Sequence, residues 1–176
     1  KEYGVSQLVL TDINTTSACI DFVRKSTDFD IKPIIGIDFR NGVQQQFVCI
    51  AKNNEGFHEI NDYLSGILHR NERIEAIAPE FKNVFTIYPF EKRKKYSLRD
   101  DEFIGVRITD IPYVRLKKCD TSKMVVLHTT TFRNKKDFNA HRLLRAIDKN
   151  LLLSKLPKEE QGSESHKMIS LSELKA

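Results

Sequence analysis

Side chains that could do chemistry follow several short apolar runs of the sequence. The residues directly after these runs are Thr11-Asp12, Asp38, Tyr88 and His128-Thr129. In parallel α/β sheets the reactive groups come from the carboxyl ends of strands, because the loops there converge on one mouth. Two carboxylates and an imidazole at such a mouth could hold a divalent metal ion and activate water for phosphoester hydrolysis. Asp12 and Asp38 are therefore the candidate metal ligands.

The set of candidate ligands is small for that chemistry, and each candidate has a simpler interpretation. A two-metal site needs many ligands close together, yet the sequence holds neither His-x-His nor a close Asp/His pair. Asp12 could instead organise the turn into the following helix through local hydrogen bonds. Asp38 could face solvent, and His128 could be a hydrogen-bonded strand-end histidine. Kinase, esterase and dehydrogenase functions have no support, because no P-loop, nucleophile elbow or dinucleotide glycine fingerprint occurs.

The elements that would position these side chains can be read from the pattern of apolar residues. Runs that are β-branched or aromatic and mostly lack alternation predict strands buried on both faces, as in parallel sheets, at 7–11, 33–37, 47–51, 84–88 and 124–127. Helical spacing of apolar residues predicts three helices. The first covers 16–25, with Cys19, Ile20 and Val23 on one face. The second begins at Asn54 and has Phe57, Ile60, Leu64, Ile67 and Leu68 on one face, and the third begins at Asp137 and has Ala140, Leu144, Ile147 and Leu151. Side chains between Asn14 and Thr16, at Asn53 or Asn54, and at Asn134 are the expected N-caps. This order indicates an α/β domain with a largely parallel sheet, and a barrel-like arrangement is possible.

Composition narrows the class of protein. The 176 residues fit one domain, and 40% hydrophobic with 30% charged residues is typical of a globular protein. No apolar run approaches the roughly 20 residues that span a bilayer. Three distant cysteines argue against a disulfide framework and favour a reducing cytoplasm. With Lys1 as first residue and strand-like sequence almost at once, we expect the chain to be a fragment of something longer.

A basic cluster is the one sequence feature that points to nucleic acid. It consists of Lys92, Arg93, Lys94 and Lys95, which are candidates for contacts with DNA phosphates. The alternative is a solvated loop, since charge runs mostly decorate surfaces. The surplus of 29 basic over 24 acidic residues is too small to decide between them.

Four segments of the sequence carry the motifs of a known family. They are Leu8–Asn14 continuing to Ala18, Ile31–Asp38, Ile50–Phe57 with its "AKNxEG" pattern, and Lys136–Leu144, which is close to an "ED…AHxxL" helix. Together they resemble the polymerase and histidinol phosphatase (PHP) domain at the start of the bacterial replicative DNA polymerase III alpha subunit. The similarity covers most of the chain and is weakest from about Arg70 to Leu116. The resemblance implies a distorted (βα)7 TIM-like barrel, incomplete at its N-terminus, over residues 1–156. Residues 157–176 would be a polar connection and the start of the next polymerase element.

The resemblance also implies a metal cluster at the barrel mouth, and the sequence departs from that pattern at the ligands. The family's His-x-His motif would fall before Lys1, and its Thr-Asp-His motif reads Thr11-Asp12-Ile13. Asp38 stands for a glutamate, the region of Phe90 replaces a cysteine, and Thr129-Thr130-Thr131 replaces Asp-x-His. Asp12 and Asp38 would be vestigial ligands, so no cofactor and no catalytic residue is expected in this domain.

The resemblance gives a structural role as the expected function. The partners would be the rest of the alpha subunit and a separate proofreading exonuclease subunit, with DNA bound through the full-length protein and no membrane involved. The alternative is an active metal-dependent phosphoesterase or 3′–5′ proofreading exonuclease that holds divalent metal ions. Nucleotidyl transfer itself would lie downstream of Ala176.

Overall fold

The computed structural model describes residues 3–93, 97–170 and 172–173. The chain divides into two compact units, one made of Lys1 and Val5–Leu127 and the other of Glu2–Gly4 and His128–Ala176. This division into compact units does not test the expected domain boundary at residue 156, which stays a prediction. The elements of the first unit are β1 (Gln7–Ile13), α1 (Cys19–Asp28), β2 (Lys32–Asn41), β3 (Gln44–Ala51), α2 (Asn54–Arg70), β4 (Val84–Pro89), β5 (Glu102–Val106), α3 (Ile111–Leu116) and β6 (Met124–Val126).

The first unit is built on one mixed sheet with the strand order β1-β2-β3-β4-β5-β6. The β1–β2, β4–β5 and β5–β6 pairs are parallel, whereas β3 runs antiparallel to both of its neighbours. The expectation of a largely parallel sheet is confirmed, because five of the six strands run in one direction. Strand β3 alone is reversed, because β2 and β3 form a hairpin. Its turn contains Asn41-Gly42, and Gly42 takes a φ of 60°, which glycine adopts at little cost.

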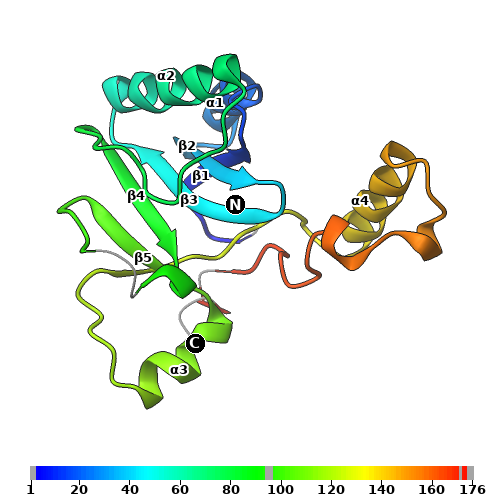
Figure 1. Cartoon of the computed structure of the whole chain (residues 1–176). Helices are drawn as coiled ribbons and strands as arrows, with labels where there is room; N and C mark the ends of the chain where they lie inside the picture. The colour runs from blue at the N-terminus through cyan, green and yellow to red at the C-terminus, as the bar shows by residue number, and fades with distance from the viewer. Residues whose placement is uncertain (1–2, 94–96, 171, 174–176) are drawn as a thin grey trace. The chain divides into compact units, whose positions relative to one another are not determined.

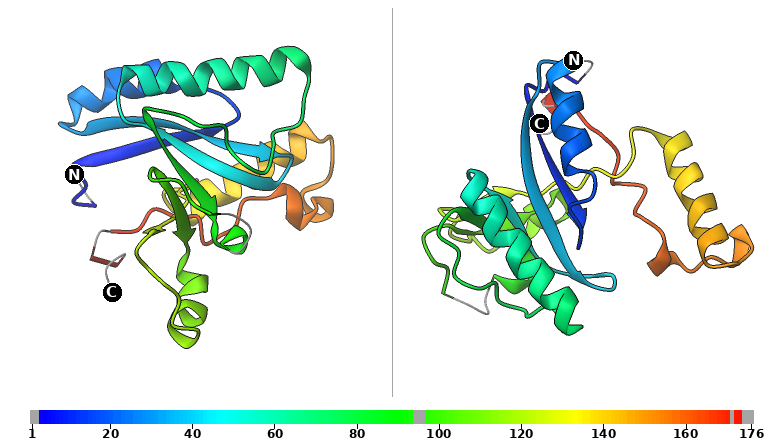
Figure 2. Two further views of the ribbon diagram at one scale, coloured as in Figure 1. Left: turned by 60° about the vertical axis from the view of Figure 1, so that its left-hand side comes forward. Right: turned by 90° about the horizontal axis from the view of Figure 1, so that it is seen from above.

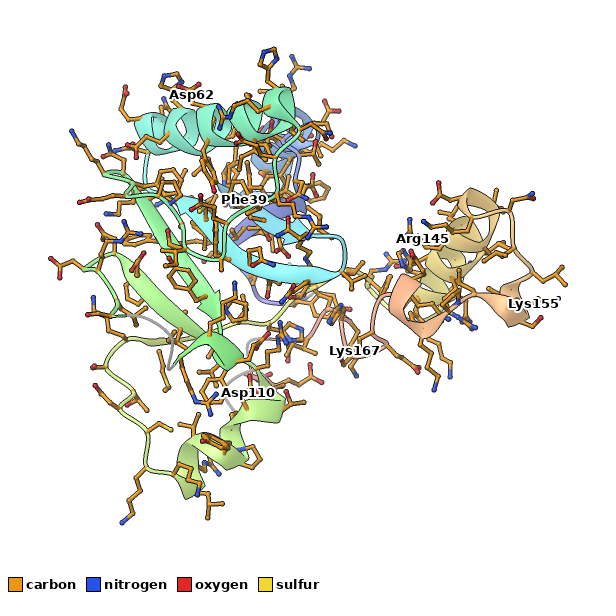
Figure 3. All side chains as sticks on the ribbon, in the orientation of Figure 1. Phe39, Asp62, Asp110, Arg145, Lys155 and Lys167 are labelled. Atoms are coloured by element: carbon orange, nitrogen blue, oxygen red, sulfur yellow. The ribbon has the colours of Figure 1, made fainter. Side chains whose placement is uncertain are left out.

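The strands curl into a half-barrel, not a closed barrel, and α1 and α2 lie together over one face of it (Figures 1 and 2). The core lies between this face and α2, where Ile37, Phe39, Phe47, Cys49 and Ile60 have no more than 1% of their surface exposed. Figure 3 shows Phe39 beneath α2. The opposite, concave face carries the side chains that alternate with these core residues, including Asp38.

The predicted helix from Asn54 is confirmed, and its sequence explains both of its ends. Asn53 is the N-cap, and its side-chain oxygen accepts a hydrogen bond from Gly56 N at 2.9 Å. Asn71 ends the helix in the left-handed region at φ 53°. Ile60, Leu64 and Ile67 are buried, as their spacing predicts.

Helix α1 departs from its predicted position. It begins three residues later than expected, and its N-cap is Ala18, whose side chain makes no capping bond. Of the predicted apolar face only Cys19 is buried, whereas Ile20 is 61% exposed. Strand β5 and helix α3 were not predicted at all, because Glu102–Val106 is only five residues long and charged residues precede it.

The second unit contains α4 (Lys135–Asp148) and two short 3₁₀ turns, Leu153–Lys155 and Lys158–Glu160. The predicted cap is confirmed, since the Asn134 side chain accepts hydrogen bonds from Lys136 N and Asp137 N. The buried Phe132 packs against Phe138 and His141 of the helix. The predicted apolar face is wrong as a core face, because Leu144 and Ile147 are each 66% exposed.

Across the described part of the chain, no helix is both long enough and apolar enough to cross a membrane.

Candidate functional site

Asp38 lies in β2 on the concave face of the sheet and is 4% exposed. Arg40 donates to Asp38 Oδ2 through Nε at 2.9 Å and through Nη2 at 2.6 Å. Gln45 Nε2 lies 3.0 Å from both carboxylate oxygens. The expectation that Asp38 could face solvent is wrong, because this carboxylate is buried and neutralised by a neighbouring guanidinium.

A second guanidinium extends this cluster. Arg107, directly after β5, donates through Nη2 to Gln45 Oε1 at 3.0 Å. Gln45 thereby links an acid on β2 to a cation beyond β5, two positions that are far apart in the sequence. We call Asp38, Arg40, Gln45 and Arg107 the β2 polar cluster. Its formal charge is +1, from two arginines and one aspartate.

The structure does not bring Asp12 to Asp38. Asp12 pairs with Ile37 and Ile13 pairs with Asp38 in the parallel β1–β2 register. Because side chains alternate along a strand, Asp12 shares the helix-covered face with Ile37, whereas Ile13 shares the concave face with Asp38. Burial chiefly, and the charge of Asp12 in addition, raise the pKa of Cys19 in α1. The two candidate ligands therefore lie on opposite faces of the sheet.

The turn after β1 is organised by Asn14 rather than by Asp12. Asn14 Nδ2 donates to Arg40 O at 2.8 Å, and Arg40 N donates to Asn14 Oδ1 at 2.9 Å. Asn14 N also donates to Asp38 O at 3.1 Å, and its φ is 51°. Asn tolerates this left-handed backbone, so the sequence signal was the Asn two residues beyond the Asp. These bonds fix the backbone on both sides of the Asp38 side chain.

Lys92 does not belong to an exposed basic loop. It is 6% exposed, and its ammonium donates to Gln46 O and Gln46 Oε1 at 2.9 Å and to Ala76 O at 3.3 Å. Gln46 is the extra residue where the β2–β3 register shifts. The hypothesis that Lys92 contacts DNA phosphates is corrected, because its charge is held inside the fold.

The remaining members of the basic cluster have different positions. The Arg93 guanidinium lies over the rings of Phe90 and Tyr113, at 4.2 Å and 4.4 Å from their centres, and Nη1 donates to Phe90 O. Such cation–π contacts hold the guanidinium in place. Lys94 and Lys95 lie outside the described residues. Of the two members that the structure describes, Lys92 is buried and Arg93 is held against aromatic rings.

His128 and Thr129–Thr131 belong to the second unit. His128 Nε2 lies 2.9 Å from Lys167 O, so this histidine is hydrogen-bonded as its simpler interpretation required. Thr131 N donates to His166 O at 2.8 Å.

A buried acid that sequence reasoning missed lies on the helix-covered face. Glu102, at the start of β5, is 5% exposed and accepts hydrogen bonds from Arg99 Nε at 2.9 Å and from Tyr88 Oη at 2.9 Å. Burial opposes ionisation of Glu102, but the bonds from Arg99 and Tyr88 outweigh it and lower the pKa of this carboxyl. Burial raises the pKa of Tyr88 to about 12. Thr86, Arg99 and Glu102 line a pocket of about 400 Å³.

A comparison with protein families finds a match over most of the first unit. The PHP domain family matches residues 1–112. The chain belongs to the PHP domain family. The matched part of this PHP domain runs from β1 through β5 and includes the whole β2 polar cluster. No match was found among curated proteins.

The donor set of this PHP domain does not fit the metal cluster that the family implies. Both oxygens of Asp38 accept N–H groups, and the residue that pairs with it on β1 is the aliphatic Ile13. The Phe90 ring packs edge-on against Tyr113, with ring centres 5.8 Å apart. Within the described residues, no group of three or more His, Cys, Asp or Glu side chains could hold a metal ion.

Proposed function

We propose that this PHP domain belongs to a bacterial replicative DNA polymerase III alpha subunit, in which it is a structural domain without phosphoesterase activity. In this proposal it braces the polymerase core, in particular the thumb, and docks a proofreading exonuclease subunit. The polymerase context is supported by the four sequence segments that resemble the alpha subunit, above all Ile50–Phe57 with its "AKNxEG" pattern.

The observation that carries the structural role is the ion pair between Asp38 and Arg40. A metal ion at Asp38 would have to displace a guanidinium whose Nε and Nη2 both donate charge-assisted hydrogen bonds to Oδ2. The displaced Arg40 and the nearby Arg107 would then both repel the metal ion. In the β2 polar cluster the Arg40 guanidinium therefore neutralises the buried Asp38 carboxylate, which is the role of a divalent ion in a metal site.

The structural role is tested by metal content and hydrolysis together. We expect well below one zinc, manganese or iron ion per chain after extensive dialysis, measured by elemental analysis. Neither bis-p-nitrophenyl phosphate nor a 3′-labelled oligonucleotide should be hydrolysed above background in added manganese. Two or more tightly held metal ions with hydrolysis that Asp38→Asn removes would favour the active phosphoesterase or exonuclease instead. Hydrolysis that persists in Asp38→Asn would not come from a site built on Asp38.

The polymerase context has a separate test. The gene sequence beyond the codon of Ala176 should encode polymerase motifs in the same reading frame. A stop codon, or an unrelated domain in that place, would contradict the alpha-subunit assignment without affecting the metal result.

A further inference from the structure

An exposed apolar stripe runs along α4 on the side away from its packing partners. Leu143, Leu144 and Ile147 are 52%, 66% and 66% exposed, and Ala140 is exposed on the same side. These residues recur at spacings of one, three and four, which is one face of a helix. We call them the α4 stripe. The described residues of the second unit leave half or more of the surface of these three large side chains exposed.

The opposite side of α4 makes the contacts that hold the helix in its unit. Phe138 and His141 pack on Phe132, Arg142 Nε donates to Gln161 at 2.7 Å, and Ala146 is 2% exposed. Arg145, which is labelled in Figure 3, forms ion pairs with Asp148 and Glu160. The contacts that hold α4 in its unit are therefore made by the side opposite to the α4 stripe.

The apolar surface continues beyond the end of the helix. Leu151 is 43% exposed and Leu152 is 67% exposed, and they follow the last helical residue, Asp148, by three and four positions. Single exposed leucines are ordinary on protein surfaces, but a contiguous set marks an interaction site.

The charges around the α4 stripe say what kind of partner would fit. Residues 133–158 contain eight basic and two acidic side chains. Several of these cations are paired with Glu160 or Glu164, as Arg145, Lys149 and Lys135 are. Lys136 is exposed, lies on the line of the stripe four residues before Ala140, and forms no ion pair among the described residues.

The position of Lys136 at the start of α4 favours binding of a carboxylate from a partner protein. Lys135 and Lys136 are the first two residues of α4, where the helix dipole is positive and disfavours cations. Asp137 is the acid of the first turn, and it lies near Arg133. A partner carboxylate beside Lys136 would interact favourably with the ammonium and with the helix end.

We propose that the α4 stripe is a docking surface for an acidic amphipathic helix of a protein partner. The apolar side chains of that helix would cover Leu143, Leu144 and Ile147, and a carboxylate at one end would meet Lys136. This inference names a surface for the structural role proposed above and rests on it. A nucleic-acid backbone would leave the leucines uncovered. Arg142 and Arg145 are engaged within the unit, and a lipid surface is tested separately below with anionic vesicles.

Binding of designed peptides to the full chain tests this surface. The probe is a fluorescent helical peptide of about 14 residues with leucines on one face and glutamates beside them, which spans roughly 20 Å against roughly 17 Å between Lys136 and Ile147. A peptide with lysines in place of the glutamates is the control. Fluorescence anisotropy should show at least about tenfold tighter binding of the acidic peptide, a difference of about 1.4 kcal/mol.

Variants locate the binding and test its charge dependence. The double variant Leu144→Ser, Ile147→Ser should lose at least about tenfold in affinity. Lys136→Glu should reverse the preference between the two peptides. Leu116→Ser, which changes a 78% exposed leucine of α3, is the matched control and should bind like the unchanged protein.

Several results would overturn the proposal. Equal binding of both peptides, or affinity that the double variant leaves unchanged, would show that the α4 stripe is not the site. Self-association in sedimentation, or binding to anionic lipid vesicles, that the double variant abolishes would assign the stripe to a second copy or to a membrane surface. A melting temperature that falls sharply in the double variant would show that this chain itself covers the stripe. None of these results changes the metal and hydrolysis assays, so failure of the structural role remains separately visible.

Discussion

Glu102, at the start of β5, is the centre of a buried hydrogen-bond cluster. It is held by Arg99, Tyr88 and the backbone N–H of Arg99, whose bond to Oε2 measures 2.8 Å. In turn Arg99 Nη2 donates to Ala78 O at 2.6 Å, and Tyr88 Oη accepts from Ala78 N at 3.1 Å. These bonds tie β4 and β5 to the connection that follows α2. Nothing in the sequence separates Glu102 from Asp100 and Asp101 beside it, so its burial could not be predicted.

The lowered pKa of Glu102 predicts a pH dependence of stability. A carboxyl whose pKa is lower in the folded than in the unfolded chain stabilises the fold at neutral pH, and this contribution is lost as the pH falls below about 4.5. Glu102→Gln should therefore lower the free energy of unfolding at pH 7 by roughly 1–3 kcal/mol. The difference from the unchanged protein should narrow toward pH 3. Urea unfolding at both pH values measures it, with the exposed Glu80→Gln as control, and a difference independent of pH would contradict the prediction.

Tyr88→Phe isolates the hydroxyl in this cluster. The change leaves the buried Ala78 N–H without its acceptor and removes one donor to Glu102. We expect a loss of roughly 1–3 kcal/mol in the free energy of unfolding, the cost of an unsatisfied buried group. Chemical denaturation should show no comparable loss for Tyr3→Phe, and a neutral Tyr88→Phe would mean that water replaces the hydroxyl.

At the scale of the elements, the cap and the buried face of α2 were predictable from the sequence, whereas for α4 only the cap was. Both helices have an Asn cap and apolar spacing, and both caps are confirmed. Periodicity tells which residues share a face, but it does not tell whether that face meets a core. In α2 the apolar face covers the sheet, whereas in α4 it is exposed. The β2–β3 hairpin was missed although Asn41-Gly42 is a hairpin signal, because the apolar runs around it were interpreted as buried parallel strands.

The cap of α2 provides a test at this scale. Asn53→Ala removes the acceptor of Gly56 N and should lower the free energy of unfolding by about 1 kcal/mol, within a range of about 0.5–2 kcal/mol. Asn54→Ala changes the next residue, which makes no capping bond, and should change stability little. Guanidinium denaturation of both variants compares them directly, and equal losses would show that the cap contributes nothing.

The surroundings of Asp38 were not predicted from the sequence. Asp38 was expected to follow a strand that ends at residue 37, whereas it lies within β2, which continues to Asn41. Gln45 and Arg107 were not considered, because only the β2–β3 hairpin and the packing of the sheet bring them to Asp38. Lys92 was placed with Arg93 because a run of charges usually marks a surface. Only tertiary packing supplies the three oxygen acceptors that bury Lys92.

At the scale of the whole molecule, the distribution of charge predicts weak binding to DNA. The surplus of five positive charges is small, Lys92 is buried, and the Arg93 guanidinium lies over two aromatic rings. We expect a dissociation constant of about 10 μM or weaker for duplex DNA near physiological salt. A fluorescence-anisotropy titration measures it. Sub-micromolar binding that Lys94→Ser with Lys95→Ser abolishes would make this segment a DNA contact and contradict the structural role.

The burial of Lys92 bears on how the first unit unfolds. Its ammonium joins the bulge of β3, the connection after α2 and the turn after β4, which contribute Gln46, Ala76 and Lys92 itself. An ammonium that has left water is costly unless all of its acceptors are in place. A partly assembled sheet that lacks any one of these three segments would leave the Lys92 ammonium without some of its hydrogen-bond acceptors. The three segments should therefore open together in a single cooperative step, with similar protection from amide hydrogen exchange, rather than by fraying from one end.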